Sequence, residues 1–146
     1  MTAKEYLSKI QTYRQIMQTY ADRIEELYHE ASGLKAIVYD KDRVQTSPEQ
    51  KMEKIFAQID TVAEKYVKAR LRYEREAQKR IDQITKLDNA MHVRMLTLRY
   101  VDGKRWEEIA CLMHYSFRHV TRLHGQALAA FTARYKDVLS CPKKQC

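Results

Sequence analysis

The sequence has 146 residues, of which 32% are charged and 45% hydrophobic, with only three glycines and two prolines. This composition is typical of long amphipathic helices and leaves little material for the turns of a β protein. The net charge of +8 favours an acidic partner. The net positive charge increases along the chain. It is zero in residues 1–48 (seven basic, seven acidic), +3 in 49–87 (ten and seven) and +5 in 88–146 (ten and five).

The three cysteines, Cys111, Cys141 and Cys146, are odd in number and form no CxxC pair. This pattern argues against a disulfide framework or a zinc site and fits a reducing compartment. No run approaches the ~20 apolar residues of a membrane span. The five histidines make no metal-binding spacing, and no glycine-rich phosphate loop occurs. We therefore expect a cytoplasmic protein that is not an enzyme and has no membrane segment, metal or cofactor.

The first predicted element is a helix over residues 3–32. Its apolar residues alternate at spacings of four and three, which is a heptad seam facing a partner helix. Thr2 and Glu5 are placed to form a capping box, and Gly33 is a plausible stop. The seam consists of Tyr6, Ile10, Tyr13, Met17, Tyr20, Ile24, Leu27, Ala31 and Leu34.

A second long helix is predicted to start at Ser47-Pro48, with serine as the cap and proline at the first helical position. Its seam is formed by Met52, Ile55, Ile59, Val62, Tyr66, Ala69 and Tyr73, and it continues, with a shift, to Leu87. We expect the two helices to form an antiparallel, coiled-coil-like hairpin across a polar loop at 33–47. One narrow seam buries little surface, so residues 1–87 are expected to form a homodimer with a four-helix bundle.

The pattern changes after Leu87, where three shorter helices are predicted. Asp88 is expected to cap the first, which places Met91, Met95 and Leu98 on one face, and Asp102-Gly103 is a turn signal. A helix over 106–112 follows, then a break at 113–115 and a longer helix capped by Ser116. A helix, a tight turn and a longer helix are the layout of a helix-turn-helix, here Arg105 to Tyr135.

The last helix has two distinct faces at ~100° per residue. Val120, Leu123 and Ala127 form the face expected to pack on Met95, Ile109 and Ala110. The opposite face carries Arg118, Thr121, Arg122 and Gly125. Arginine pairs bidentately with guanine, so this face is predicted to read bases in a DNA groove.

Residues 98–110 and 115–128 resemble the region-four helix-turn-helix of sigma factors. They are more similar to small phage-encoded proteins of Gram-positive bacteria, relatives of the ArpU-type late transcription regulators. The opening Met1–Leu7 and the loop segment Asp42–Ser47 are similar to that family as well. The resemblance implies a prophage transcriptional regulator that binds double-stranded DNA in the bacterial cytoplasm, with RNA polymerase as a further candidate partner.

The resemblance also implies roles for single residues. The positions that would contact bases are Phe117, Arg118, Thr121 and Arg122, and those that would contact the DNA backbone are Lys104, Arg105, Ser116, His119, His124 and Gly125. Arg105 stands where the family often has a capping threonine, so the capping box with Glu108 is expected to be lost. His114 replaces the usual glycine of the turn, a position that histidine tolerates if it is left-handed.

The predicted organisation is thus an all-α chain with three parts. Residues 1–87 form the helical hairpin, 88–139 the sigma-like helix-turn-helix and 140–146 a flexible tail. Two other functions are compatible with the same module. One is DNA packaging, as in the small subunit of terminases, and the other is binding to RNA polymerase or another protein without direct contact to DNA bases.

Overall fold

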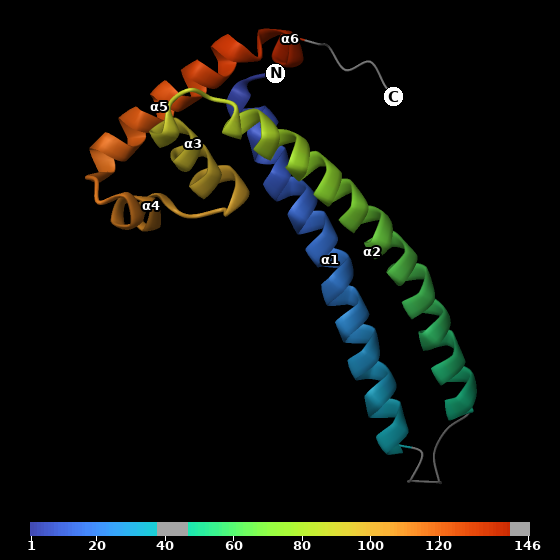
Figure 1. Ribbon diagram of the computed structural model, residues 1–146. Coiled ribbons are helices and arrows are strands. Elements are labelled where there is room, and N and C mark those ends of the chain that lie inside the picture. Colours follow the sequence, from blue (N-terminus) through green and yellow to red (C-terminus); the bar gives the residue numbers. More distant parts are fainter. Residues whose placement is uncertain (38–46, 141–146) are drawn as a thin grey trace. The chain divides into compact units, whose positions relative to one another are not determined.

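The computed structural model describes residues 1–37 and 47–140, and only the backbone of 35–37. All regular structure in these ranges is helical, which confirms the all-α prediction. The elements are α1 (Ala3–Ile37), α2 (Pro48–Thr85), α3 (Ala90–Leu96), the π-helical turn η1 (Thr97–Val101), α4 (Trp106–Met113), α5 (Phe117–Arg134) and α6 (Lys136–Ser140) (Figure 1). No helix within the described ranges is long and apolar enough to cross a membrane. Most of the loop predicted at 33–47 lies outside the described residues, and so does most of the predicted tail, including Cys141 and Cys146.

The chain forms two compact units, and both long helices pass from one into the other. One unit comprises Met1–Thr12 and the chain from Glu74 onward, and the other is Tyr13–Tyr73. The boundary expected at residue 87 therefore does not coincide with the division. The reason is that Tyr6, Leu7 and Ile84 share one apolar core with the short helices.

In the unit Tyr13–Tyr73, α1 and α2 lie side by side (Figure 1). Leu27, Ala31, Ile55 and Ile59 form their buried contact. Each seam residue described in this unit is buried or half-buried, as the spacing predicts. The hydroxyl of Tyr73 accepts hydrogen bonds from Arg14 Nε and Nη2, at 3.2 and 2.8 Å, so a polar group on the seam is satisfied by an arginine of the facing helix.

Two predicted helix ends are wrong. Helix α1 continues through Gly33 to Ile37, because Gly33 does not adopt the positive φ of a C-terminal stop, and Ala31 and Leu34 still pack on α2. Helix α3 is capped by Asn89 rather than Asp88. The backbone of Asn89 is extended, and its side chain accepts a hydrogen bond from Met91 N–H at 2.9 Å. The Thr2–Glu5 capping box is confirmed, with hydrogen bonds of 2.8 and 3.2 Å.

The core of the first unit gathers residues from both ends of the sequence. Leu7, Ile84, Met95, Ile109, Val120 and Phe131 are all fully buried in it. Arg80 is also buried: Nε donates to Tyr6 O at 2.9 Å, and Nη1 donates to the Glu76 carboxylate at 2.7 Å. The hydrogen bond from Arg80 lowers the pKa of Glu76. The hydrogen bond to Tyr6 O joins the end of α2 to the start of α1, and Glu76 holds the arginine in place.

Candidate nucleic-acid interface

Helix α4 begins after an extended residue, Arg105, with φ −75° and ψ 160°. The backbone N–H of Arg105 donates to Glu108 Oε2 at 2.7 Å, and this hydrogen bond lowers the pKa of Glu108. The expected complete loss of the capping box is therefore wrong. One half remains, while the other cannot form because a guanidinium has no acceptor atom.

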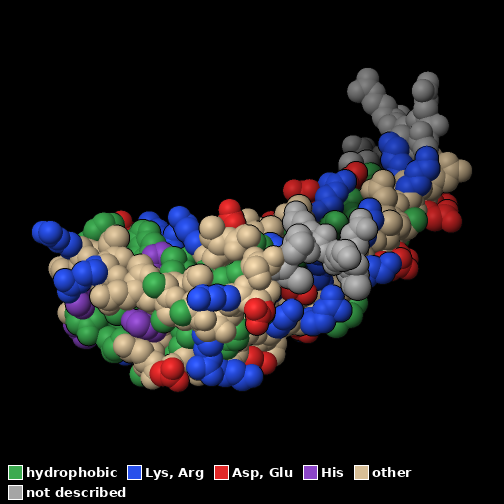
Figure 2. All heavy atoms as spheres, turned by 90° about the horizontal axis from the view of Figure 1, so that it is seen from above, with side chains coloured by type: hydrophobic (Ala, Val, Ile, Leu, Met, Phe, Trp, Pro, Cys, Tyr) green, Lys and Arg blue, Asp and Glu red, His purple; other side chains and the backbone are tan. Residues whose placement is uncertain are grey.

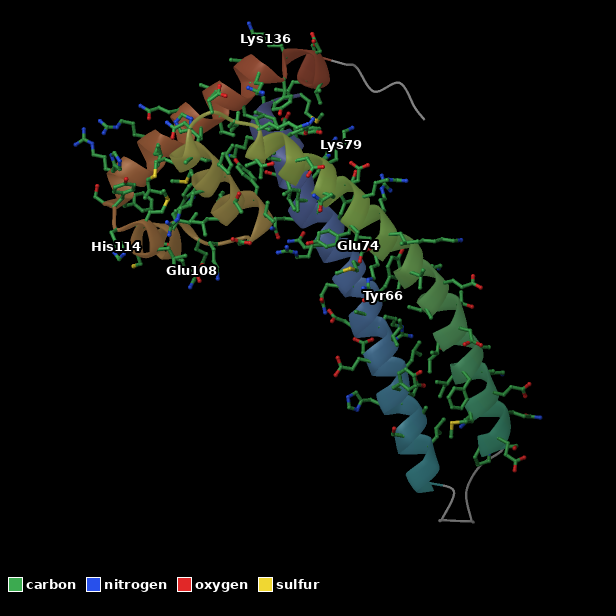
Figure 3. The ribbon with its side chains drawn as sticks, in the orientation of Figure 1. Tyr66, Glu74, Lys79, Glu108, His114 and Lys136 are labelled. Atoms are coloured by element: carbon green, nitrogen blue, oxygen red, sulfur yellow. The ribbon has the colours of Figure 1, made fainter. Side chains whose placement is uncertain are left out.

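A left-handed residue, His114, makes the corner between α4 and α5 (Figure 3). Its φ and ψ are 55° and 40°. His114 N–H donates to Cys111 O at 3.3 Å and Tyr115 N–H donates to Ala110 O at 3.0 Å, the two bonds of a Schellman motif. Histidine therefore occupies a position that favours glycine. The last carbonyl groups of α4 stabilise the corner by accepting these two hydrogen bonds.

Helix α5 starts with the predicted serine cap. Ser116 Oγ accepts a hydrogen bond from His119 N–H at 3.3 Å. The ring of Tyr115 meets the ring of His119 edge to face at a centroid distance of 4.4 Å. These contacts fix the first turn of α5 relative to the corner.

The two faces of α5 have the predicted residues. Val120, Leu123 and Ala127 are buried in the core that contains Met95 and Ile109. Phe117, Arg118, Thr121, Arg122 and Gly125 are all exposed, and Phe117 is 56% exposed. Lys, Arg and His side chains gather over the start of α5, at the left of Figure 2.

Local contacts set the geometry of this exposed face. Thr121 Oγ1 donates back to Phe117 O at 3.0 Å, so the hydroxyl proton is used within the helix while the oxygen can still accept a hydrogen bond. Arg122 Nη2 lies 3.0 Å from His119 Nδ1. A Cβ built on Gly125 meets no atom within 4 Å, which leaves the backbone there open to a close approach from outside.

The predicted backbone contacts have different environments. Arg105 is exposed, whereas Lys104 and His119 are half-buried and the Ser116 hydroxyl is used as a cap. The expected contact of His124 with DNA does not fit the structure, because His124 is only 9% exposed. It falls between Val120 and Ala127 on the packed side of α5.

His124 instead belongs to an aromatic cluster under α5. Its Nε2 lies 2.9 Å from the Tyr100 hydroxyl, and its ring meets Trp106 at 4.7 Å, edge to face. Burial, with help from the charges of Arg99 and Lys4, lowers the pKa of His124 to about 4. Burial raises the pKa of Tyr100 to about 12. Both groups are therefore neutral at physiological pH.

Three further residues connect the segments around α4 and were not predicted from the sequence. Arg94 Nη2 donates to Leu112 O at 3.2 Å, and the Arg99 guanidinium lies 4.4 Å from the Trp106 ring centroid. Gln11 donates to Tyr100 O and Val101 O in η1, at 2.8 and 3.2 Å. Each joins segments that no short motif connects.

In residues 1–37 and 47–140, no group of three His, Cys, Asp or Glu side chains is placed to hold a metal ion. No protein-family model, curated protein or solved structure matches the chain.

Proposed function

We propose that the protein binds double-stranded DNA through a helix-turn-helix formed by α4, the His114 corner and α5. The observation that carries the proposal is the exposed face of α5, where Arg118, Thr121, Arg122 and Gly125 lie opposite the buried face. No acidic residue occurs between Arg118 and Lys136. A positive helix face presented after a rigid corner suits insertion into the major groove.

The residues on this face have different roles in the proposal. Arg118 and Arg122 hydrogen-bond to guanine O6 and N7. Thr121 offers its methyl group and a hydroxyl oxygen that can accept a hydrogen bond, because the hydroxyl proton is donated to Phe117 O. Phe117 and the Thr121 methyl contact thymine methyl groups, and the open backbone at Gly125 approaches a phosphate.

The resemblance to phage-encoded sigma-like proteins supports a more specific role. We propose that the protein is a prophage transcriptional regulator of the bacterial cytoplasm that acts by binding promoter DNA. Residues 1–87 are proposed to form an antiparallel helical hairpin that dimerises and so sets the spacing of the two half-sites. Exposed apolar side chains on α2 support self-association: Phe56, Val67 and Leu71.

The test compares Arg118→Ala/Arg122→Ala with the wild type in anisotropy titrations at one fixed salt concentration. The two probes are DNA flanking the protein's own gene and random DNA of equal length. The wild type should prefer the flanking DNA, and the variant should lose this preference while keeping its helicity and subunit number. Unchanged preference in the variant would overturn the proposal.

A matched control removes two exposed cations outside the proposed reading face, Lys86→Ala/Lys136→Ala. This control should keep the preference, although its affinity for all DNA falls slightly. Footprinting on the flanking DNA then separates a promoter from a packaging site. A solution mass of eight or more subunits would favour the packaging function over the regulator.

A further inference from the structure

One side of α2 carries positive charge along its length. Within the unit Tyr13–Tyr73, positions at alternating spacings of three and four residues follow one line of the helix surface. All of them are exposed, five are Lys or Arg, and none is acidic. This α2 basic stripe consists of Lys51, Lys54, Gln58, Thr61, Lys65, Lys68 and Arg72.

The stripe borders a shallow groove between α1 and α2. One hollow of about 250 Å³ is lined by Tyr13, Ile16 and Tyr20 of α1 and by Lys65, Lys68, Ala69 and Arg72 of α2. A second, of about 280 Å³, is lined by Arg23 and Leu27 of α1 and by Ala57, Gln58, Thr61 and Val62 of α2. No carboxylate is among these lining residues.

The lysines at the centre of the stripe are not held in ion pairs. Lys65 and Lys68 form no ion pair with any residue that the structure describes, and Arg72 lies over the Tyr13 ring at 4.8 Å. The exposed acids of α2 in this unit, Glu49, Glu53, Asp60 and Glu64, are outside the stripe, and Glu64 borders it four residues before Lys68. Lys65 has Lys68 one turn away, and Lys68 has Arg72, so like charges repel along this part of the helix and a bound anion would relieve the repulsion.

We propose that the α2 basic stripe binds the sugar-phosphate backbone of duplex DNA as a second, sequence-independent contact, a proposal that rests on the proposed function. From Lys51 to Arg72 the stripe is roughly 32 Å long at ~1.5 Å per residue, close to the ~34 Å of one DNA turn. The cations fall into two groups, Lys51 with Lys54 and Lys65 with Lys68 and Arg72. The groups are roughly 16 Å apart along the helix at ~1.5 Å per residue, and each suits the repeated negative charge of a phosphate backbone.

A protein partner fits the same surface less well. Lysine is depleted at the centre of protein interfaces, where aromatic and apolar groups dominate. The exposed apolar residues of α2, Phe56, Val67 and Leu71, lie outside the stripe and outside the groove lining. The apolar and aromatic part of that lining, Tyr13, Ile16 and Tyr20, belongs to α1 and not to the stripe. The stripe therefore matches a polyanion, while the apolar flank matches another protein surface.

The experiment titrates a 30-base-pair random-sequence duplex against the full chain at several NaCl concentrations. The Lys65→Gln/Lys68→Gln variant is compared with the wild type and with Arg118→Ala/Arg122→Ala. Loss of two phosphate contacts should make the slope of log K against log salt shallower by about 2. The same two substitutions should leave the preference for the flanking DNA intact, whereas the α5 variant should lose it.

The matched control lowers the net charge by the same two units on α1, at exposed positions outside the groove lining: Gln18→Glu/Ser32→Glu. Its slope should stay close to that of the wild type. An unchanged slope in the lysine variant, or an equal change in the control, would overturn the stripe proposal. A changed subunit number in the lysine variant would instead assign the stripe to protein contact. If the Arg118→Ala/Arg122→Ala variant alone behaves unexpectedly and keeps its preference for the flanking DNA, the proposal that α5 reads the DNA sequence is overturned and the stripe proposal stands.

Discussion

His124 is a polar residue on the packed side of α5, and its partners come from outside that helix. The structure buries it, because Tyr100 supplies a hydroxyl 2.9 Å from Nε2 and Trp106 covers the ring. Tyr100 precedes His124 by 24 residues, so no local pattern predicts this partner.

Because His124 is buried as a neutral group, we expect the protein to lose stability as the pH falls below about 6.5, before most carboxylates become protonated. The pKa of His124 is about 4 in the folded protein and about 6.5 in the unfolded chain, so the unfolded state binds more protons between these values. The stabilising contribution of neutral His124 is fully present above pH ~6.5. As the pH falls toward 4, the free energy of unfolding decreases by roughly 2–4 kcal/mol over the whole interval. Urea unfolding between pH 7.5 and 5 measures the first part of this loss.

The control for this prediction is His124→Gln, which keeps a hydrogen-bonding side chain beside Tyr100 and removes the titration. The variant should show a flatter stability profile between pH 7.5 and 5, whatever its absolute stability. Equal slopes in the two proteins would show that another group causes the loss.

At the scale of elements, several features that depend on neighbouring residues were predictable, whereas the helix ends expected at Gly33 and Asp88 were not. The Thr2–Glu5 box, the Ser116 cap and the exposed face of α5 follow from residues within one or two turns. The corner is left-handed at His114, a conformation that histidine was expected to tolerate if the turn required it. By contrast, η1 depends on Gln11, which is 89 residues from Tyr100, and the buried Arg80 donates to Tyr6, 74 residues away. Contacts of this range depend on the tertiary fold, which periodicity does not specify.

Gly125 gives the second prediction, because its helical position has opposite consequences for stability and for binding. A Cβ there would meet no atom, so Gly125→Ala should raise the unfolding free energy by about 1 kcal/mol through helix propensity. If the backbone approaches a phosphate, the same methyl group should weaken binding to DNA. Urea unfolding and anisotropy at fixed salt measure the two effects.

A matched substitution is available at the other helical glycine, Gly33, where a built Cβ also meets nothing within 4 Å. Gly33→Ala lies outside α5 and should stabilise the protein without changing its affinity for DNA. Tighter or equal binding by Gly125→Ala would show that no DNA group approaches this part of α5.

For the whole molecule, the two heptad seams predicted which helices pack together but not where the compact units divide. The seam residues look alike along α1, whereas Tyr6 and Leu7 join the core of the short helices and Leu27 and Ala31 do not. The difference comes from Met95, Phe131 and their neighbours, which reach the first turns of α1 only in the folded chain. A continuous pattern on one helix can therefore serve two cores.

The last prediction concerns self-association through α2. Phe56, Val67 and Leu71 are 44%, 52% and 60% exposed, and spacings of eleven and four residues keep them on one side of the helix. Apolar groups exposed on one flank are typical of a partner surface. Replacing Val67→Glu and Leu71→Glu should convert the proposed dimer to a monomer, because two desolvated carboxylates strongly oppose the contact. Sedimentation equilibrium gives the mass of each form, with Gln18→Glu/Ser32→Glu as the charge-matched control. A control that also dissociates, or a double variant that stays dimeric, would place the interface elsewhere.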